Sequence, residues 1–117
     1  MGKIVLVLIL LIAGCQPDLS TRVEVVSEVN ADGKLVIGGK ELSLCGVKIT
    51  NLTQAREYLQ SFIGQEVGVV YSDSFSVEVF VNLGETPEIF LNEELIVRRI
   101  GEAINDRCPN QMLLDNI

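Results

Sequence analysis

The chain contains no histidine and no tryptophan, and its three cysteines include no CxxC pair. Without histidine, a Ser-His-Asp arrangement is excluded. Two or three isolated cysteines do not make a zinc shell, and a thioredoxin-like redox motif needs the missing pair. A glycine-rich phosphate loop is also absent. These absences remove most of the common catalytic and metal-binding constellations.

Basic residues are scarce as well. The chain has 9 lysine and arginine residues against 16 aspartate and glutamate residues, a formal net charge of −7. Proteins that bind nucleic acid draw affinity from cationic side chains on phosphates, and single-strand binders add stacking aromatics. An acidic chain with no tryptophan therefore predicts that nucleic acid is not a partner.

No apolar run is long enough to cross a membrane. The longest, Ile4 to Ile12, has nine residues, whereas a spanning helix needs about 20. Lys3 precedes the run, the small pair Ala13-Gly14 closes it, and Cys15 follows, which is the layout of a secretory signal peptide. The ending IAGC resembles a bacterial lipobox, and this resemblance implies cleavage before Cys15 and a diacylglycerol on its thiol. An ordinary signal peptide or an uncleaved anchor is the alternative.

This interpretation divides the chain into residues 1–14 (signal peptide), 15–22 (lipidated tether), 23–108 (folded domain) and 109–117 (C-terminal tail). The mature portion would carry 8 basic and 16 acidic residues, a charge of −8 that anionic headgroups repel. We therefore expect the membrane to be reached through the lipid on Cys15. Gln16, where an aspartate would favour the inner membrane, favours the outer membrane facing the periplasm.

Two cysteines remain once Cys15 carries lipid. An exported protein sits in an oxidising space, where two thiols usually pair. We expect a Cys45–Cys108 disulfide that ties the end of the chain to its middle, with a typical gain of about 2–4 kcal/mol. Two separate buried thiols are the alternative.

Hydrophobic periodicity predicts five strands and two helices. The first helix covers 51–64, with Asn51 as N-cap and Gly64 as the stop, and its apolar face is Leu52, Ala55, Leu59, Phe62 and Ile63. The second helix starts at Asn92, and its apolar face is Leu95, Ile96, Ile100, Ala103 and Ile104. The strands are Arg22–Val29, Lys34–Ile37, Glu41–Ile49, Glu66–Tyr71 and Val77–Val81.

Five short strands with a helix after the third fit an OB-fold barrel, so the predicted class is α+β, mainly β with helices. Three segments in this order resemble the staphylococcal-nuclease-like (thermonuclease) family over roughly residues 23–104: ADGKLVI, YLQSFIGQEVGVVYSDSFSVEVFV and LNEELIVRRIGEAI. The resemblance implies a nuclease-type OB barrel with a C-terminal helix. It also implies an ancestral Ca²⁺-dependent phosphodiester hydrolysis that uses carboxylates and two arginines.

The residues of that chemistry are replaced in this chain. The family's second aspartate becomes Lys34, and its arginines become Ser43 and Val77. In the middle motif an aspartate becomes Lys48, which would place a cation where the metal binds, and the proline and glutamate become Thr50 and Asn51. Asp32 is the one weak candidate for a metal ligand. Loss of a transition-state donor of this kind costs orders of magnitude in rate.

The sequence therefore predicts a non-catalytic, lipid-anchored envelope module that needs no cofactor and binds an unknown protein partner. Phe75, at a turn between serines, is the candidate contact residue. The alternative is a residual nuclease that binds Ca²⁺ through Asp32. A purely structural lipoprotein without a specific ligand is a third hypothesis.

Overall fold

The computed structural model of the protein describes residues 21–115. The predicted signal peptide, Cys15 and residues 116–117 lie outside the described residues. No helix among residues 21–115 is long and apolar enough to cross a membrane.

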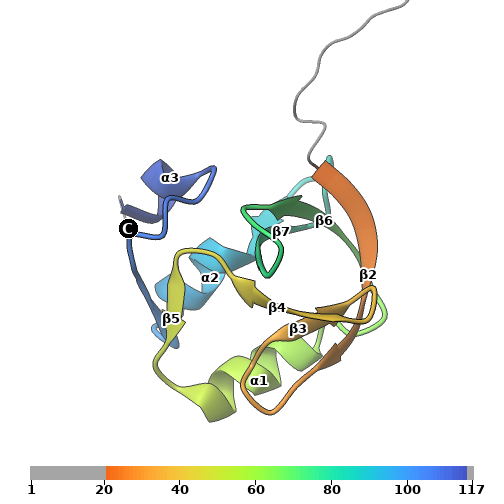
Figure 1. Cartoon of the computed structure of the whole chain (residues 1–117), viewed down its shortest axis with the longest axis horizontal. Coiled ribbons are helices and arrows are strands. Elements are labelled where there is room, and N and C mark those ends of the chain that lie inside the picture. Colours follow the sequence, from red (N-terminus) through yellow and green to blue (C-terminus); the bar gives the residue numbers. More distant parts are fainter. Residues whose placement is uncertain (1–20, 116–117) are drawn as a thin grey trace, which may run out of the picture.

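Five strands close into a barrel (Figure 1). Strands β2 (Thr21–Val29), β3 (Leu35–Ile37) and β4 (Lys40–Leu44) form an antiparallel meander. Strands β6 (Glu66–Tyr71) and β7 (Ser76–Val81) form a hairpin that pairs through β6 with β2. A short parallel pairing of β4 with β7 closes the barrel. The α+β class and the five-stranded barrel are as predicted, and the topology is consistent with an OB-like barrel.

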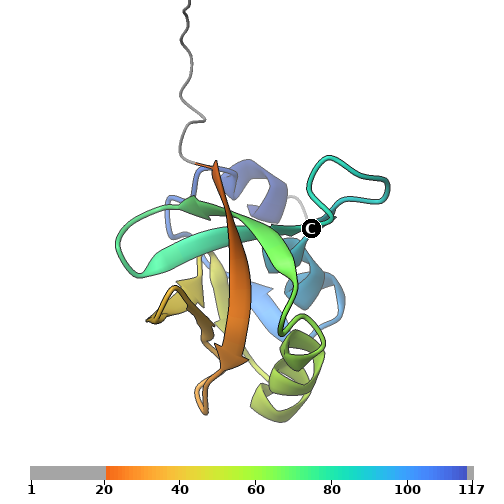
Figure 2. The same cartoon turned by 90° about the vertical axis from the view of Figure 1, so that its right-hand side faces the viewer.

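The barrel interior is filled by the alternating apolar side chains of its strands, as period-two burial requires. The fully buried side chains include Val26, Leu35, Ile37, Leu42, Val69, Val77 and Val79. Helix α1 (Leu52–Gln60) lies at the end of the barrel opposite the start of β2 (Figures 1 and 2). The Asn51 side chain accepts a hydrogen bond from the Gln54 amide, which confirms the predicted N-cap.

The apolar face predicted for the first helix is partly wrong. Ala55, Leu59 and Phe62 are buried, but Leu52 and Ile63 are each 43% exposed. Leu52 is the first residue of the helix, and Ile63 follows its last residue, Gln60. The helix is thus shorter than its periodicity suggests, and its buried stripe does not include its first residue or Ile63.

The predicted third strand is also divided. Residues 41–49 form β4 and a separate strand, β5 (Val47–Ile49), with Gly46 at φ 78° between them. A left-handed backbone of this kind interrupts a strand, and glycine adopts it without steric cost. β5 leaves the barrel and pairs with β9 (Gly101–Ala103).

The predicted second helix is the largest correction. Helix α2 covers Leu91–Val97 and follows β8 (Ile89–Phe90). Arg98 is its C-cap, and the helix does not continue because Arg99 has a φ of 62° and the chain then turns into β9. Ala103 and Ile104, predicted on the helix's apolar face, are both exposed. A last short helix, α3 (Gln111–Asp115), buries Leu114 within the region predicted as a tail.

A second apolar cluster lies outside the barrel wall. It consists of Cys45, Phe90, Cys108 and Leu114, with Phe80 stacked on Phe90 at a ring distance of 4.8 Å. The Cys45–Cys108 disulfide is present, as predicted, and spans 63 residues of sequence. It holds the segment from Ile104 to Asp115, which we call the C-terminal cover, against β7 and α2.

Candidate functional site

Asp32 and Lys34, two of the positions that the nuclease resemblance relates to metal binding, line one small cavity. It has a volume of about 160 Å³ and is lined by Asp32, Gly33, Lys34, Ser43, Leu44, Val47 and Ile49. The β2–β3 turn supplies the first three of these residues, and β4 and β5 supply the rest. The cavity thus joins segments that are far apart in sequence.

The β2–β3 turn is held firmly at this cavity. The Asn30 carboxamide oxygen accepts hydrogen bonds of 2.9 Å from the Asp32 and Lys34 amides. From α1, the Arg56 Nε donates to the Asn30 carbonyl at 3.0 Å. Gly33, at φ 81°, lies so close to Ile49 that a Cβ there would meet its Cδ1 at 2.8 Å. These contacts order the backbone of the turn that carries Asp32 and Lys34.

The donor set of the cavity does not fit Ca²⁺. This ion takes six to eight oxygen ligands, several of them carboxylates. Asp32 is the one carboxylate among the lining residues, and Lys34 brings a cation into the same cavity. Lys48, the other predicted cation, is exposed on β5 and does not line the cavity. Val77 is fully buried in the barrel core and offers no charge.

One cluster of three potential metal-ligating side chains occurs among residues 21–115, formed by Cys45, Asp106 and Cys108. Both sulfurs belong to the disulfide and are not available as thiolate ligands. The Asp106 carboxylate instead accepts a hydrogen bond from the Gly46 amide at 3.3 Å. This cluster secures the C-terminal cover and gives no metal site in the oxidised protein.

Phe75 lies at the turn between β6 and β7 and is 68% exposed. Its backbone is fixed on both sides. The Phe75 amide donates to the Asp73 carboxylate at 2.8 Å, and the Phe75 carbonyl accepts from the Ser43 amide at 2.8 Å. An aromatic ring is thus presented to solvent on a backbone that is already ordered, which lowers the entropic cost of binding through it.

Tyr71, at the base of the same turn, is surrounded by charges. The Arg22 guanidinium lies 5.4 Å and the Lys40 ammonium 5.2 Å from the ring centroid, both within the range of cation–π attraction. The Tyr71 hydroxyl donates to the Glu24 carboxylate at 3.0 Å. Burial, and then this hydrogen bond, raise the pKa of Tyr71. Two cations of an acidic protein are thereby held next to the turn that carries Phe75.

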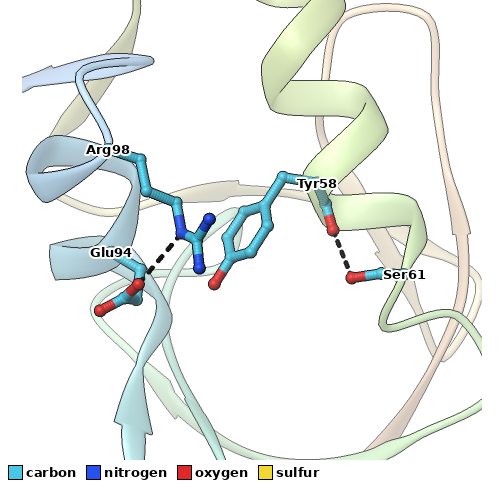
Figure 3. Close-up of polar contacts among 4 residues, drawn as sticks. All are labelled: Tyr58, Ser61, Glu94 and Arg98. Carbon is cyan, nitrogen blue, oxygen red and sulfur yellow. Dashed lines mark hydrogen bonds and ion pairs between the residues drawn. The ribbon is translucent and has the colours of Figure 1, made fainter.

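A shallower groove of about 350 Å³ lies between α1 and the end of α2, lined by Gln54, Glu57, Tyr58, Arg98 and Ile100. Figure 3 shows the Arg98 guanidinium lying over the Tyr58 ring, at 4.2 Å from its centroid. The Arg98 Nε also forms an i,i+4 ion pair with Glu94 at 3.1 Å. Burial raises the pKa of Tyr58, and Arg98 opposes this rise. Arg98 thus contacts both Tyr58 on α1 and Glu94 on α2. We therefore interpret these three residues as a structural contact that holds the two helices together.

Comparison with known proteins adds no assignment, since no protein-family model, no curated protein and no solved structure matches this chain. The sequence correctly indicated that Phe75 is exposed at a turn. It gave no sign of the Arg22–Tyr71–Lys40 cluster. These residues lie on three different strands, and their proximity depends on the barrel's closure.

Proposed function

We propose that this protein is a non-catalytic, lipid-anchored module of the bacterial cell envelope that binds a protein partner through the Phe75 turn. In this proposal the barrel is a degenerate relative of the thermonuclease type, exported, and held by the lipid on Cys15 at the outer membrane facing the periplasm. Two observations together carry the proposal. The cavity has a donor set that does not fit Ca²⁺, and the Phe75 side chain is 68% exposed on an ordered turn.

The chemistry of the cavity supports the non-catalytic part. Hydrolysis of a phosphodiester by the family's mechanism needs a metal and cationic donors at the developing charge. The cavity offers one carboxylate, one lysine and one serine among apolar side chains. The residues at the two arginine positions, Ser43 and Val77, carry no charge, and Val77 is 0% exposed.

The surroundings of Phe75 support the binding part. Interface hot spots are enriched in aromatic residues and arginine, and they bind best when they are preorganised. The turn holds Phe75 by two backbone hydrogen bonds, and Arg22 and Lys40 lie beside Tyr71 at its base. A protein surface with an apolar pocket and neighbouring carboxylates would complement this arrangement.

The catalytic alternative is tested with the oxidised protein, a fluorescent single-stranded oligonucleotide, Ca²⁺ and low salt. We expect no cleavage on gels and no change in anisotropy, because the cationic and carboxylate groups are missing. Cleavage that disappears in Asp32→Ala would establish the residual nuclease instead. Binding without cleavage would redirect the proposal toward a nucleic-acid module.

The partner is tested by site-specific photo-crosslinking in the bacterium that makes the protein. A benzophenone side chain replaces Phe75 in one variant and Leu52 in the control. We expect a discrete protein adduct from position 75 alone, because Leu52 is also exposed, at 43%, but lies on α1 at the other end of the barrel. The same adduct from both positions, or none from position 75, would contradict the assigned surface.

A further inference from the structure

Several of the exposed large apolar side chains gather at the end of the barrel where the described chain begins. Val23 is 63% exposed, Leu83 41%, Met112 76% and Leu113 48%. Figures 1 and 2 share a vertical axis, and in both the start of β2 and helix α3 lie at the upper end of the molecule. We call this end the tether end. The turn that carries Phe75 borders it, because Tyr71 at the base of that turn follows Val70, the partner of Thr21.

Sheet register places two of these side chains, Val23 and Leu83, next to each other. Val23 pairs with Gly68 across β2 and β6, and the Leu83 side chain lies over Gly68, 2.8 Å from where a Cβ would be. The absence of a side chain at Gly68 therefore gives Leu83 room beside Val23. The adjacent row runs from Thr21 through Val70 to Glu78.

Glu78 links that row to α3. This carboxylate lies on the outer wall of β7, is 0% exposed, and accepts hydrogen bonds from the Asn110 amide and side chain at 2.6 and 2.7 Å. Asn110 directly precedes α3, so the helix is fixed two strands away from Thr21. Leu114 faces inward, and Met112 and Leu113 remain exposed.

The length of the preceding chain indicates what covers this surface. Cys15 lies six residues before Thr21, and six extended residues reach at most about 20 Å. If Cys15 carries lipid, as the proposed function requires, the tether end is confined near the bilayer surface. The opposite end is farther away by the length of β2, nine residues or about 30 Å.

We propose that the tether end docks onto the phospholipid bilayer, with Leu83 and Leu113 in the interfacial region; this inference rests on the proposed lipid attachment. The driving force is burial of apolar surface, because the nearby charges of Glu85, Glu88 and Asp115 do not favour anionic headgroups. The surface is therefore suited to neutral lipid and should be insensitive to salt. Docking leaves the Phe75 turn, which projects sideways in Figure 2, open to a partner.

The test uses the absence of tryptophan from the chain. Leu113→Trp and Leu52→Trp are each introduced into the acylated full-length protein, which is reconstituted in phosphatidylcholine vesicles containing acyl-brominated lipid. The two parent side chains have similar exposure, 48% and 43%, but lie at opposite ends of the barrel. We expect quenching and a blue-shifted emission for Leu113→Trp, with at least threefold weaker quenching for Leu52→Trp, in both low and high salt. Leu83→Trp serves as a second reporter at the tether end and should behave like Leu113→Trp.

Equal quenching at positions 113 and 52, or no quenching at 113 and 83 in protein that floats with the vesicles, would overturn the docking and leave the lipid anchor intact. Flotation and mass spectrometry of the unsubstituted protein report the anchor separately. An unacylated protein that does not float would remove the anchor and the docking together. A tether end that is covered by a protein instead of lipid would give the unquenched result on these vesicles.

Discussion

At the residue scale, a buried polar side chain connects secondary-structure elements that are distant in sequence. Asn92 is 0% exposed, yet its side chain donates to the Cys45 and Val77 carbonyls at 2.8 and 3.1 Å and accepts from the Val79 amide at 3.0 Å. These bonds fix α2 to β7 and to the end of β4. Buried amides persist only when they are satisfied in this way. The sequence suggested Asn92 as a helix start, and the structure gives it a tertiary role that local patterns do not encode.

The two tyrosines make a prediction at this scale. Burial raises the pKa of both Tyr58 and Tyr71 above the ordinary value of 10.0. The folded state therefore holds these protons more tightly than the unfolded state above pH 10, so their stability contribution is present below pH 10. It is lost as the pH rises through the folded pKa values.

Tyrosinate absorbance checks this directly, because the chain has two tyrosines and no tryptophan. We expect the native protein to titrate above pH 10 and the denatured protein to titrate near the ordinary value. Tyr71→Phe should halve the amplitude and leave the raised titration of Tyr58. If the native and denatured titrations coincide, the surroundings of Tyr58 and Tyr71 do not raise their pKa values.

At the scale of elements, strands were better predicted than the region from 92 to 104. Glu66–Tyr71 was predicted with its observed bounds, because alternation is a local property of the strand. The single helix predicted from Asn92 instead ends at Val97, because β9 pairs with β5. At Gly101 a Cβ would meet the Val47 Cγ1 at 2.7 Å, so this glycine permits the close pairing. Such an approach is a tertiary contact, which helical periodicity does not reveal.

Alanine substitutions at two glycines with similar backbones test how tightly the C-terminal cover packs. Gly46 and Gly39 have similar backbones, with φ of 78° and 79°. A Cβ at Gly39 meets nothing within 4 Å, whereas one at Gly46 would overlap the Leu114 side chain and lie 3.0 Å from the Cys108 Sγ. Gly39→Ala should lower the free energy of unfolding by about 1–2 kcal/mol, the strain of the left-handed backbone alone. Gly46→Ala should lower it by a further ~1–3 kcal/mol through overpacking.

Urea unfolding of the oxidised variants measures the difference. Equal destabilisation by the two substitutions would mean that the C-terminal cover moves away from Gly46 at little cost. The Cys45–Cys108 disulfide restrains that movement, because it anchors the cover one residue before Gly46.

At the scale of the whole molecule, the order of the elements was enough to predict a five-stranded barrel, but not which side chains would meet. Asp32, Lys34 and Ser43 come together because the β2–β3 turn and β4 lie at one edge of the barrel. Arg22, Lys40 and Tyr71 come together across three strands. The cysteine count did predict one long-range contact, since few pairings were available. The other long-range contacts required the closed fold.

The pairing of β2 with β6 also governs how the protein bears mechanical load. Residues Thr21 to Val25 pair with Glu66 to Val70 in an unbroken antiparallel register, and the hydrogen bonds of such a ladder run perpendicular to the strands. A pull on the segment before Thr21, directed along β2, shears this ladder as a unit and does not peel it bond by bond. If the domain is held by its N-terminus while a partner pulls on another surface, the force is resisted by all the β2–β6 hydrogen bonds at once.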